Sequence, residues 1–267
     1  MRLYTVDSFS DRPFRGNPAG VCLLDTPAPD EWMQAVAAEM RHSETAFVLD
    51  QDGGPRSLRW FTPTVEVALC GHATLATAHV LYSLGASGRL EFSTLSGVLT
   101  TDQAGDQAGD GLITMDFPAS RPTEAQAPEG LVESLGVKPL WVGRSQFDFL
   151  VEVENADVVR SLTPDLDLLS TVETRGVMVT APGDDGEADF VSRFFGPRAG
   201  VPEDPVTGSA HCVLSPYWSE RFGRDTLVGA QLSERGGIVR TTLRGDRVEL
   251  AGRAVTIWSG NLTVPLP

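Results

Sequence analysis

The chain has few cysteines, and their arrangement does not suggest cross-links. Cys22, Cys70 and Cys212 are the 3 cysteines among 267 residues. Their odd number and irregular spacing argue against a disulfide framework. The sequence also lacks any apolar run near the ~20 residues that a membrane span requires. The first residues, MRLYTVDSFS, lack the apolar core of a signal peptide. These absences predict a cytoplasmic protein that makes no membrane contact.

Basic residues are scarce relative to acidic ones. The sequence holds 21 Lys and Arg against 36 Asp and Glu, which gives a net charge of −15 at pH 7. A surface this acidic repels a phosphate backbone, so nucleic acid is not an expected partner. A small anionic substrate fits this composition only where local hydrogen-bond donors overcome the surrounding negative field.

The chain contains none of the common motifs for nucleotide cofactors or metal ions. It has no GxxxxGK[ST] loop and no GxGxxG after a strand. HExxH, CxxC and the nucleophile elbow GxSxG are also missing. We therefore expect no cofactor and no metal site. Cys70 and His72 are two residues apart, and at that spacing their side chains are not expected to face each other, which disfavours a thiol nucleophile.

Three blocks of the sequence recur in the same order. RWFTP at 59–63 is matched by RFFGP at 193–197, GHAT at 71–74 by GSAH at 208–211, and FSTLSGVL at 92–99 by LSERGGIV at 232–239. Ordered repeats of this kind indicate a duplicated structural unit. We expect two similarly built halves, residues 1–118 and 119–267, with a last strand that can return to the first half.

Strand-like runs dominate the first half, and one longer helix-like run follows the GHAT block. Strands are expected at 3–9, 20–24, 45–49, 58–61, 90–93, 98–101 and 112–117, and helices at 29–40 and 74–84. In the second half the matching helix is expected at 209–222, with Gly223 as its stop. The segment 118–130 has the composition of a linker, and QAGDQAGD at 103–110 that of an exposed hairpin loop.

The GHAT and GSAH blocks each open a helix with glycine and other small residues. Such a start exposes backbone N–H groups that have no partner within the helix. Together with the helix dipole, these groups favour an anion such as a carboxylate. The same composition also suits an ordinary helix cap. Recurrence in both halves favours a binding site in a cleft between them.

Three side chains near these blocks are candidates for chemistry. Glu44 stands in SET before an apolar strand, where a carboxylate can be a capping group or a general acid/base. His72 lies inside the first block, and Asp204 precedes the second within EDPVTGSA. For Glu44 and His72, a purely structural role is the alternative.

Four segments together resemble one protein family. GNPAGV at 16–21, SETAFV at 43–48, RWFTPTVEVALCGHATLATA at 59–78 and EDPVTGSA at 203–210 resemble the PhzF-like, or phenazine biosynthesis-like, proteins. The resemblance implies an α+β fold of the diaminopimelate epimerase type. Such a fold has two pseudo-symmetric halves, each a curved β-sheet or barrel around a central helix, with the active site in the cleft between them. It also implies a homodimer that needs no cofactor.

The resemblance further implies an isomerase that acts on a small amino- or hydroxy-carboxylic acid. Glu44 would move a proton between two substrate carbons, with His72 and Asp204 assisting. The residues expected to line the site and bind the substrate are Asn17, Ser43, Gly71, Ala73, Gly208 and Ser209. One alternative is a non-catalytic binding or interaction module that keeps the cleft. Another is a two-base racemase, which would need a cysteine in each half, whereas the second half offers Asp204.

Overall fold

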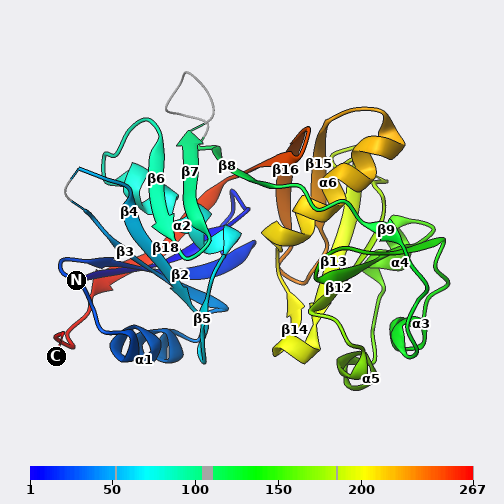
Figure 1. Ribbon diagram of the computed structural model, residues 1–267, viewed down its shortest axis with the longest axis horizontal. Coiled ribbons are helices and arrows are strands. Elements are labelled where there is room, and N and C mark those ends of the chain that lie inside the picture. The colour runs from blue at the N-terminus through cyan, green and yellow to red at the C-terminus, as the bar shows by residue number, and fades with distance from the viewer. Residues whose placement is uncertain (52, 104–110, 185, 267) are drawn as a thin grey trace. The chain divides into compact units, whose positions relative to one another are not determined.

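The computed structural model describes residues 1–51, 53–103, 111–184 and 186–266 (Figure 1). The chain forms two compact units, one made of Met1–Asp116 with Ala251–Pro267 and the other of Phe117–Leu250. The C-terminal strand thus belongs to the first unit. The expected hairpin loop at 103–110 lies, apart from Gln103, outside the described residues. Among those residues, no helix is both long and apolar enough to cross a membrane.

The first unit is a mixed sheet with two helices. Its elements are β1 (Arg2–Ser8), β2 (Asn17–Leu24), α1 (Asp30–Met40), β3 (Glu44–Leu49), β4 (Arg56–Phe61), β5 (Glu66–Val67), α2 (Gly71–Ser83), β6 (Leu90–Thr94), β7 (Gly97–Gln103), β8 (Ile113–Pro118) and β18 (Ala254–Asn261). The red strand β18 runs antiparallel to the blue β1 in Figure 1. From β1 the sheet continues through β2, β3, β4, β6, β7 and β8.

The second unit contains more short helices. Its elements are β9 (Thr123–Glu124), α3 (Leu131–Leu135), β10 (Trp141–Arg144), β11 (Asp148–Glu152), α4 (Ala156–Arg160), α5 (Leu166–Thr171), β12 (Gly176–Pro182), β13 (Phe190–Gly196), the 3₁₀ turn η1 (Pro197–Ala199), β14 (Val201–Asp204), α6 (Gly208–Phe222), β15 (Thr226–Gln231), β16 (Gly237–Arg244) and β17 (Arg247–Gly252). Its sheet runs from β9 through β10, β11, β12, β13 and β15 to β16.

Both units follow one topological plan. In the first unit, β1 to β2 is antiparallel, β2 to β3 parallel, β3 to β4 antiparallel, β4 to β6 parallel and β6 to β7 antiparallel. In the second unit, β10, β11, β12, β13, β15 and β16 repeat these directions in the same order. Each parallel step is bridged by helical chain, as parallel strands require. The sequence repeat therefore corresponds to a repeated fold.

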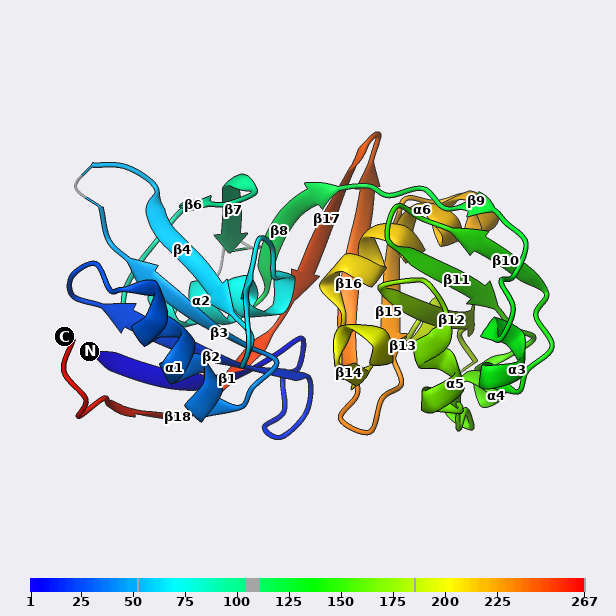
Figure 2. The ribbon, with the colours of Figure 1, turned by 60° about the horizontal axis from the view of Figure 1, so that its bottom comes forward.

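One long helix forms the centre of each unit. Helix α2 contacts β1, β2, β3 and β18, and α6 contacts β15 and β16 (Figure 2). Both are buried on nearly all sides, because their sequences carry small and apolar residues around the whole circumference. The helix expected from residue 74 already begins at Gly71, since the glycine and the three residues after it take helical conformation.

The two central helices begin without a side-chain cap. Their N-cap residues are Cys70 for α2 and Thr207 for α6, and neither side chain accepts a hydrogen bond from its helix. By contrast, Asn155 and Asp165 cap the short helices α4 and α5 with their side-chain oxygens. The first-turn N–H groups of α2 and α6 are thus not taken by an ordinary N-cap side chain.

The segment expected to be a linker is joined to the second unit by hydrogen bonds. Pro216 lies inside α6 and cannot donate to the carbonyl of Cys212, one turn earlier. The backbone N–H of Ser120 donates to that carbonyl instead, at 3.0 Å. The N–H of Ala119 donates to Asp246 O, and β9 pairs with β10. These contacts hold the segment against the unit that follows it.

The arginines of the repeated RWFTP and RFFGP blocks make the same ion pair in each unit. Arg59 donates through Nε and NH2 to the two carboxylate oxygens of Glu66, both at 2.7 Å. Arg193 donates in the same two-pronged way to Glu203, at 2.7 and 2.8 Å. Each guanidinium also lies over a phenylalanine ring of its own strand. The repeated arginine is therefore a structural feature that joins two neighbouring strands.

Candidate active site

The candidate catalytic pair of the first unit lies where β3 and α2 begin. Glu44 is the first residue of β3, and His72 is the second residue of α2. Glu44 Oε2 and His72 Nε2 are 3.3 Å apart, with side-chain exposures of 19% and 7%. Two residues that are well separated in sequence are thus brought into contact. The carboxylate keeps some access to solvent, as a group that meets a substrate must.

His72 is a neutral imidazole at physiological pH. Burial lowers the pKa of His72 to about 3, and the nearby charge of His42 lowers it further. The ring therefore acts by donating and accepting hydrogen bonds and does not supply a positive charge. His42, to which no role was assigned from its sequence context, lies close to His72, and its Nε2 is 3.0 Å from Thr5 Oγ1.

Cys70 faces His72, so the expectation that these two residues point apart is wrong. The Cys70 sulfur lies 3.5 Å from Nδ1 of His72. Cys70 is the extended N-cap residue, and side chains at the start of a helix lean back toward its N-terminus. This lean brings the ring of His72 to the preceding cysteine. The sequence spacing alone did not reveal it, because the outcome depends on where the helix starts.

The GNPAGV turn places Asn17 beside the residue before Glu44. Gly16 has a φ of +70°, and a Cβ on it would lie 2.1 Å from the carbonyl oxygen of Ser8. Only glycine fits this turn. Asn17, fully buried, follows it, and Ser43 Oγ lies 3.4 Å from Asn17 Oδ1. In the same region Ser8 Oγ donates to the backbone carbonyl of His72, which ties β1 to the start of α2.

In the second unit, Asp204 is held at the end of β14. Its carboxylate accepts a 2.6 Å hydrogen bond from Thr207 Oγ1. Gln231 Nε2 donates to the Asp204 backbone carbonyl, and Gln231 Oε1 accepts from the N–H of Thr207. Thr207 and Gln231, neither of which stood out in the sequence, thus fix the turn that leads from Asp204 into α6.

Ser209 and Arg175 meet at the first turn of α6. The NH2 group of Arg175 donates to Ser209 Oγ at 3.2 Å. Arg175 Nε donates at 2.8 Å to Asp148, whose side chain is 1% exposed, and NH2 donates to the second oxygen of the same carboxylate. Sequence reasoning missed Arg175 because it lies outside the repeated blocks. The strand register identifies this residue, because Arg175 stands immediately before β12.

The remaining predicted lining residues contribute backbone more than side chain. Gly71 and Gly208 are the first residues of α2 and α6. Ala73 is fully buried, so its methyl group packs in the core and only its N–H, in the first helical turn, lies in the predicted anion-holding region.

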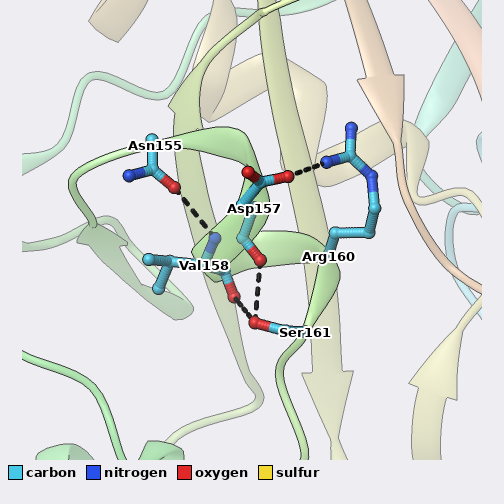
Figure 3. A pocket seen from close by; sticks show the side chains of 5 residues that line it. All are labelled: Asn155, Asp157, Val158, Arg160 and Ser161. Carbon is cyan, nitrogen blue, oxygen red and sulfur yellow. Dashed lines mark hydrogen bonds and ion pairs between the residues drawn. The ribbon is translucent and has the colours of Figure 1, made fainter.

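A hollow beside α4 is not part of the candidate active site. Figure 3 shows that its polar lining groups satisfy one another. Asn155 accepts from the N–H of Val158, Arg160 pairs with Asp157, and Ser161 Oγ donates to the Asp157 carbonyl. With these groups already partnered, the hollow lacks a converging set of donors for a ligand.

The first unit also holds one set of side chains that could bind a metal ion. In the described part of the chain, Glu44, Cys70 and His72 each offer a donor atom within 4.8 Å of the others. Carboxylate oxygen, thiolate and imidazole are all donors that Zn²⁺ accepts. The sequence has no metal-binding spacing motif for this set, because only the fold brings Glu44 close to Cys70 and His72.

Comparisons with known proteins agree with this architecture. The profile of the family described as "Phenazine biosynthesis-like protein" matches residues 6–260. The chain belongs to this family. It is 48% identical to an uncharacterized isomerase of Pseudomonas aeruginosa, with 98% of each chain covered. It is 46% identical to another of Halalkalibacterium halodurans, with 97% of each covered.

Solved structures confirm the α+β fold. A PhzF-family phenazine biosynthesis protein of Enterococcus faecalis superposes with a TM-score of 0.92 at 37% identity, over 98% of this chain and 99% of that one. A probable proline racemase of Agrobacterium radiobacter has the same fold, with a TM-score of 0.64 at 11% identity over 99% of this chain and 93% of that one. With isomerase relatives near half identity over almost the full length, this phenazine biosynthesis-like protein is an isomerase.

Proposed function

We propose that this phenazine biosynthesis-like protein is a cofactor-independent isomerase that moves a proton between two carbons of a small amino- or hydroxy-carboxylic acid. Glu44 is the general acid/base. The main support for this role is the position of Glu44, whose partly exposed carboxylate lies 3.3 Å from the buried, neutral imidazole of His72. The isomerase relatives support the reaction class.

The proton transfer balances without an added reagent. Glu44 accepts a proton as a C–H bond breaks, and the electron pair spreads into the conjugated system of the substrate. The same carboxyl group then returns the proton to another carbon, and the composition of the molecule is unchanged. His72, neutral because it is buried, acts as a hydrogen-bond donor to the charge that develops.

The second unit assists through Asp204 and the start of α6. Asp204 hydrogen-bonds a polar substituent of the substrate, and the Thr207 hydroxyl keeps the carboxylate in place. The first-turn N–H groups of α6, which no N-cap side chain occupies, are donors for an anionic group of the substrate. Asn17 and Ser43 support Glu44 from the GNPAGV turn.

A two-thiol racemase is a poorer fit to these residues. The N-cap of α2 is Cys70, and the equivalent N-cap of α6 is Thr207. Cys212 lies further into α6, where its thiol donates to the Gly208 carbonyl. A two-base mechanism needs a second thiol at the helix start, where the chain has threonine.

The decisive experiment follows solvent deuterium. Small amino- and hydroxy-carboxylic acids are incubated with the protein in D₂O, and any compound that gains deuterium is identified by NMR. Glu44→Gln, which keeps the shape and removes the base, should abolish the exchange and preserve binding. Cys70→Ser is the matched control and should retain most of the exchange. Exchange that persists in Glu44→Gln rules out the proposed base. Exchange with no compound in either protein supports the non-catalytic binding module instead.

The same assay tests the expected independence from metals. Treatment with a chelator should leave the exchange unchanged. Added Zn²⁺ should inhibit it, because the ion would occupy Glu44 together with Cys70 and His72. Loss of exchange on chelation would contradict a cofactor-independent reaction. The homodimer, which the family resemblance implies, remains a prediction to be tested by light scattering. The cytoplasmic location, predicted from the sequence, is tested by cell fractionation.

A further inference from the structure

The two units differ at the position that carries Glu44. In the first unit, Thr45 pairs with Phe61 of the RWFTP block. In the second unit, Val177 pairs with Phe195 of the matching RFFGP block. Thr45 and Val177 are thus equivalent in the repeat. One residue earlier, Glu44 corresponds to Gly176, and Ser43 corresponds to Arg175.

The second unit cannot place an acid at this position. A Cβ on Gly176 would lie 2.1 Å from Cζ of Phe194. The ring of Phe194, which is 7% exposed, thus fills the space that the Glu44 side chain takes in the first unit. The residue before Gly176 is Arg175. At nearly the same point of the fold, the first unit therefore has the carboxylate of Glu44 and the second unit has a guanidinium.

Arg175 is held in one orientation by its surroundings. Its Nε and NH2 groups donate to the buried carboxylate of Asp148. Its backbone N–H donates to Phe147 O, and its guanidinium carbon lies 5.3 Å and 6.0 Å from the ring centroids of Phe147 and Phe194. An arginine fixed in this way loses little conformational entropy when it binds a ligand.

The guanidinium still has donors to offer. Its side-chain hydrogen bonds use Nε and NH2, and among the described residues NH1 has no hydrogen-bond partner. NH2 also reaches Ser209 Oγ, at the uncapped start of α6. The exposed part of Arg175 lines a hollow together with Arg144, Arg198 and Glu173.

We propose that Arg175 is the specificity-determining residue that binds the substrate carboxylate at the start of α6, while Asp148 orients it. The inference rests on the proposed function for the identity of the ligand as a carboxylic acid. Arg175 supplies the local donor that an acidic protein needs in order to bind an anion.

The test uses two probes that differ only in the carboxylate. 3-Hydroxyanthranilate and its decarboxylated counterpart, 2-aminophenol, are titrated by calorimetry into the full chain. The variant is Arg175→Gln with Asp148→Asn, which keeps the net charge and leaves no buried carboxylate unpaired. Arg198→Gln is the control, because it removes an exposed arginine from the same hollow.

The double variant should bind 3-hydroxyanthranilate roughly tenfold to a hundredfold more weakly, the usual loss for a charge-assisted hydrogen bond. Its binding of 2-aminophenol should be unchanged, and Arg198→Gln should resemble the parent protein. Unchanged 3-hydroxyanthranilate affinity in the double variant would overturn the assignment. So would an equal loss in Arg198→Gln, or a parent protein that binds neither probe or does not distinguish them.

A second measurement needs no substitution. The side-chain Nε–H resonance of Arg175 in the ¹⁵N-labelled parent protein should shift on addition of 3-hydroxyanthranilate and stay unshifted with 2-aminophenol. If the double variant fails to fold, this titration decides, and an unshifted resonance overturns the inference. Failure of the proposed function is distinguishable, because it appears as deuterium exchange that survives Glu44→Gln, whatever Arg175 does.

Discussion

The sulfur of Cys70 lies 3.5 Å from Nδ1 of His72, while Nε2 of the same ring lies 3.3 Å from the Glu44 carboxylate. A thiol is a weak donor, and a neutral imidazole has one protonated and one bare nitrogen. If the thiol donates to Nδ1, the ring proton resides on Nε2, the ring nitrogen nearer to Glu44. Cys70 is then a positioning residue that selects the tautomer of His72.

Replacing Cys70 should therefore change the tautomer of His72. In the parent protein, ¹⁵N NMR should show His72 with its proton on Nε2. Cys70→Ala should give a mixture of the two tautomers, and Cys70→Ser, which keeps a donor, should restore the parent spectrum. Identical spectra in all three proteins would contradict the positioning role, whereas a merely structural effect would not be rescued by serine.

His211 should make the protein lose stability as the pH falls. Burial lowers the pKa of His211 to about 4 from an ordinary 6.5. Between these values the unfolded chain binds the proton more tightly, so the free energy of unfolding rises with pH. The contribution is complete above about pH 6.5 and is lost as the pH falls to about 4, for a total of about 3 kcal/mol.

Urea unfolding at a series of pH values tests this behaviour against His211→Gln, which cannot titrate. The difference in stability between parent and variant should shrink by about 3 kcal/mol from neutral pH to about pH 4. A difference that stays constant over that range would mean that His211 does not titrate as its burial predicts.

The two repeated ion pairs should differ in strength. The side chain of Arg193 is 12% exposed and that of Arg59 is 27% exposed. Arg193 NH1 also donates to the carbonyl of Leu162 at 2.7 Å. We expect Arg193→Gln to cost roughly 3–4 kcal/mol, because it leaves a carboxylate and a carbonyl without their donor, and Arg59→Gln roughly 1–2 kcal/mol. Chemical denaturation measures both, and a larger loss for Arg59→Gln would reverse the expected order.

Gly16→Ala should disturb the turn that supports the site. The backbone conformation is left-handed, and the added methyl group would collide with the Ser8 carbonyl. We expect a loss of about 2 kcal/mol or more. Gly136→Ala is the matched control, since its φ of +63° is similar but its Cβ would meet open space. Equal losses in the two variants would show that the collision at Gly16 is relieved.

Much of the fold could be predicted because repetition is visible in sequence. The blocks around Arg59 and Arg193 recur since each must join two strands in its own unit, and the expected helix at 209–222 differs from α6 by one residue. The contact between Cys70 and His72 could not be foreseen, because it follows from the exact start of α2. Arg175 was missed for a related reason. Its equivalence to Ser43 comes from strand register, and the two residues share no sequence pattern.

The pairing of β18 with β1 has a consequence for how the protein is made. One edge of β1 is covered by residues 254–261, which are synthesised after the whole second unit. The second unit, a continuous segment from Phe117 to Leu250, is complete before that strand exists. We therefore expect the second unit to fold first during synthesis. Until β18 is synthesised, the first unit, which bears Glu44, has an unpaired edge at β1. The residue that performs the proposed chemistry then lies in the later of these two units to become native.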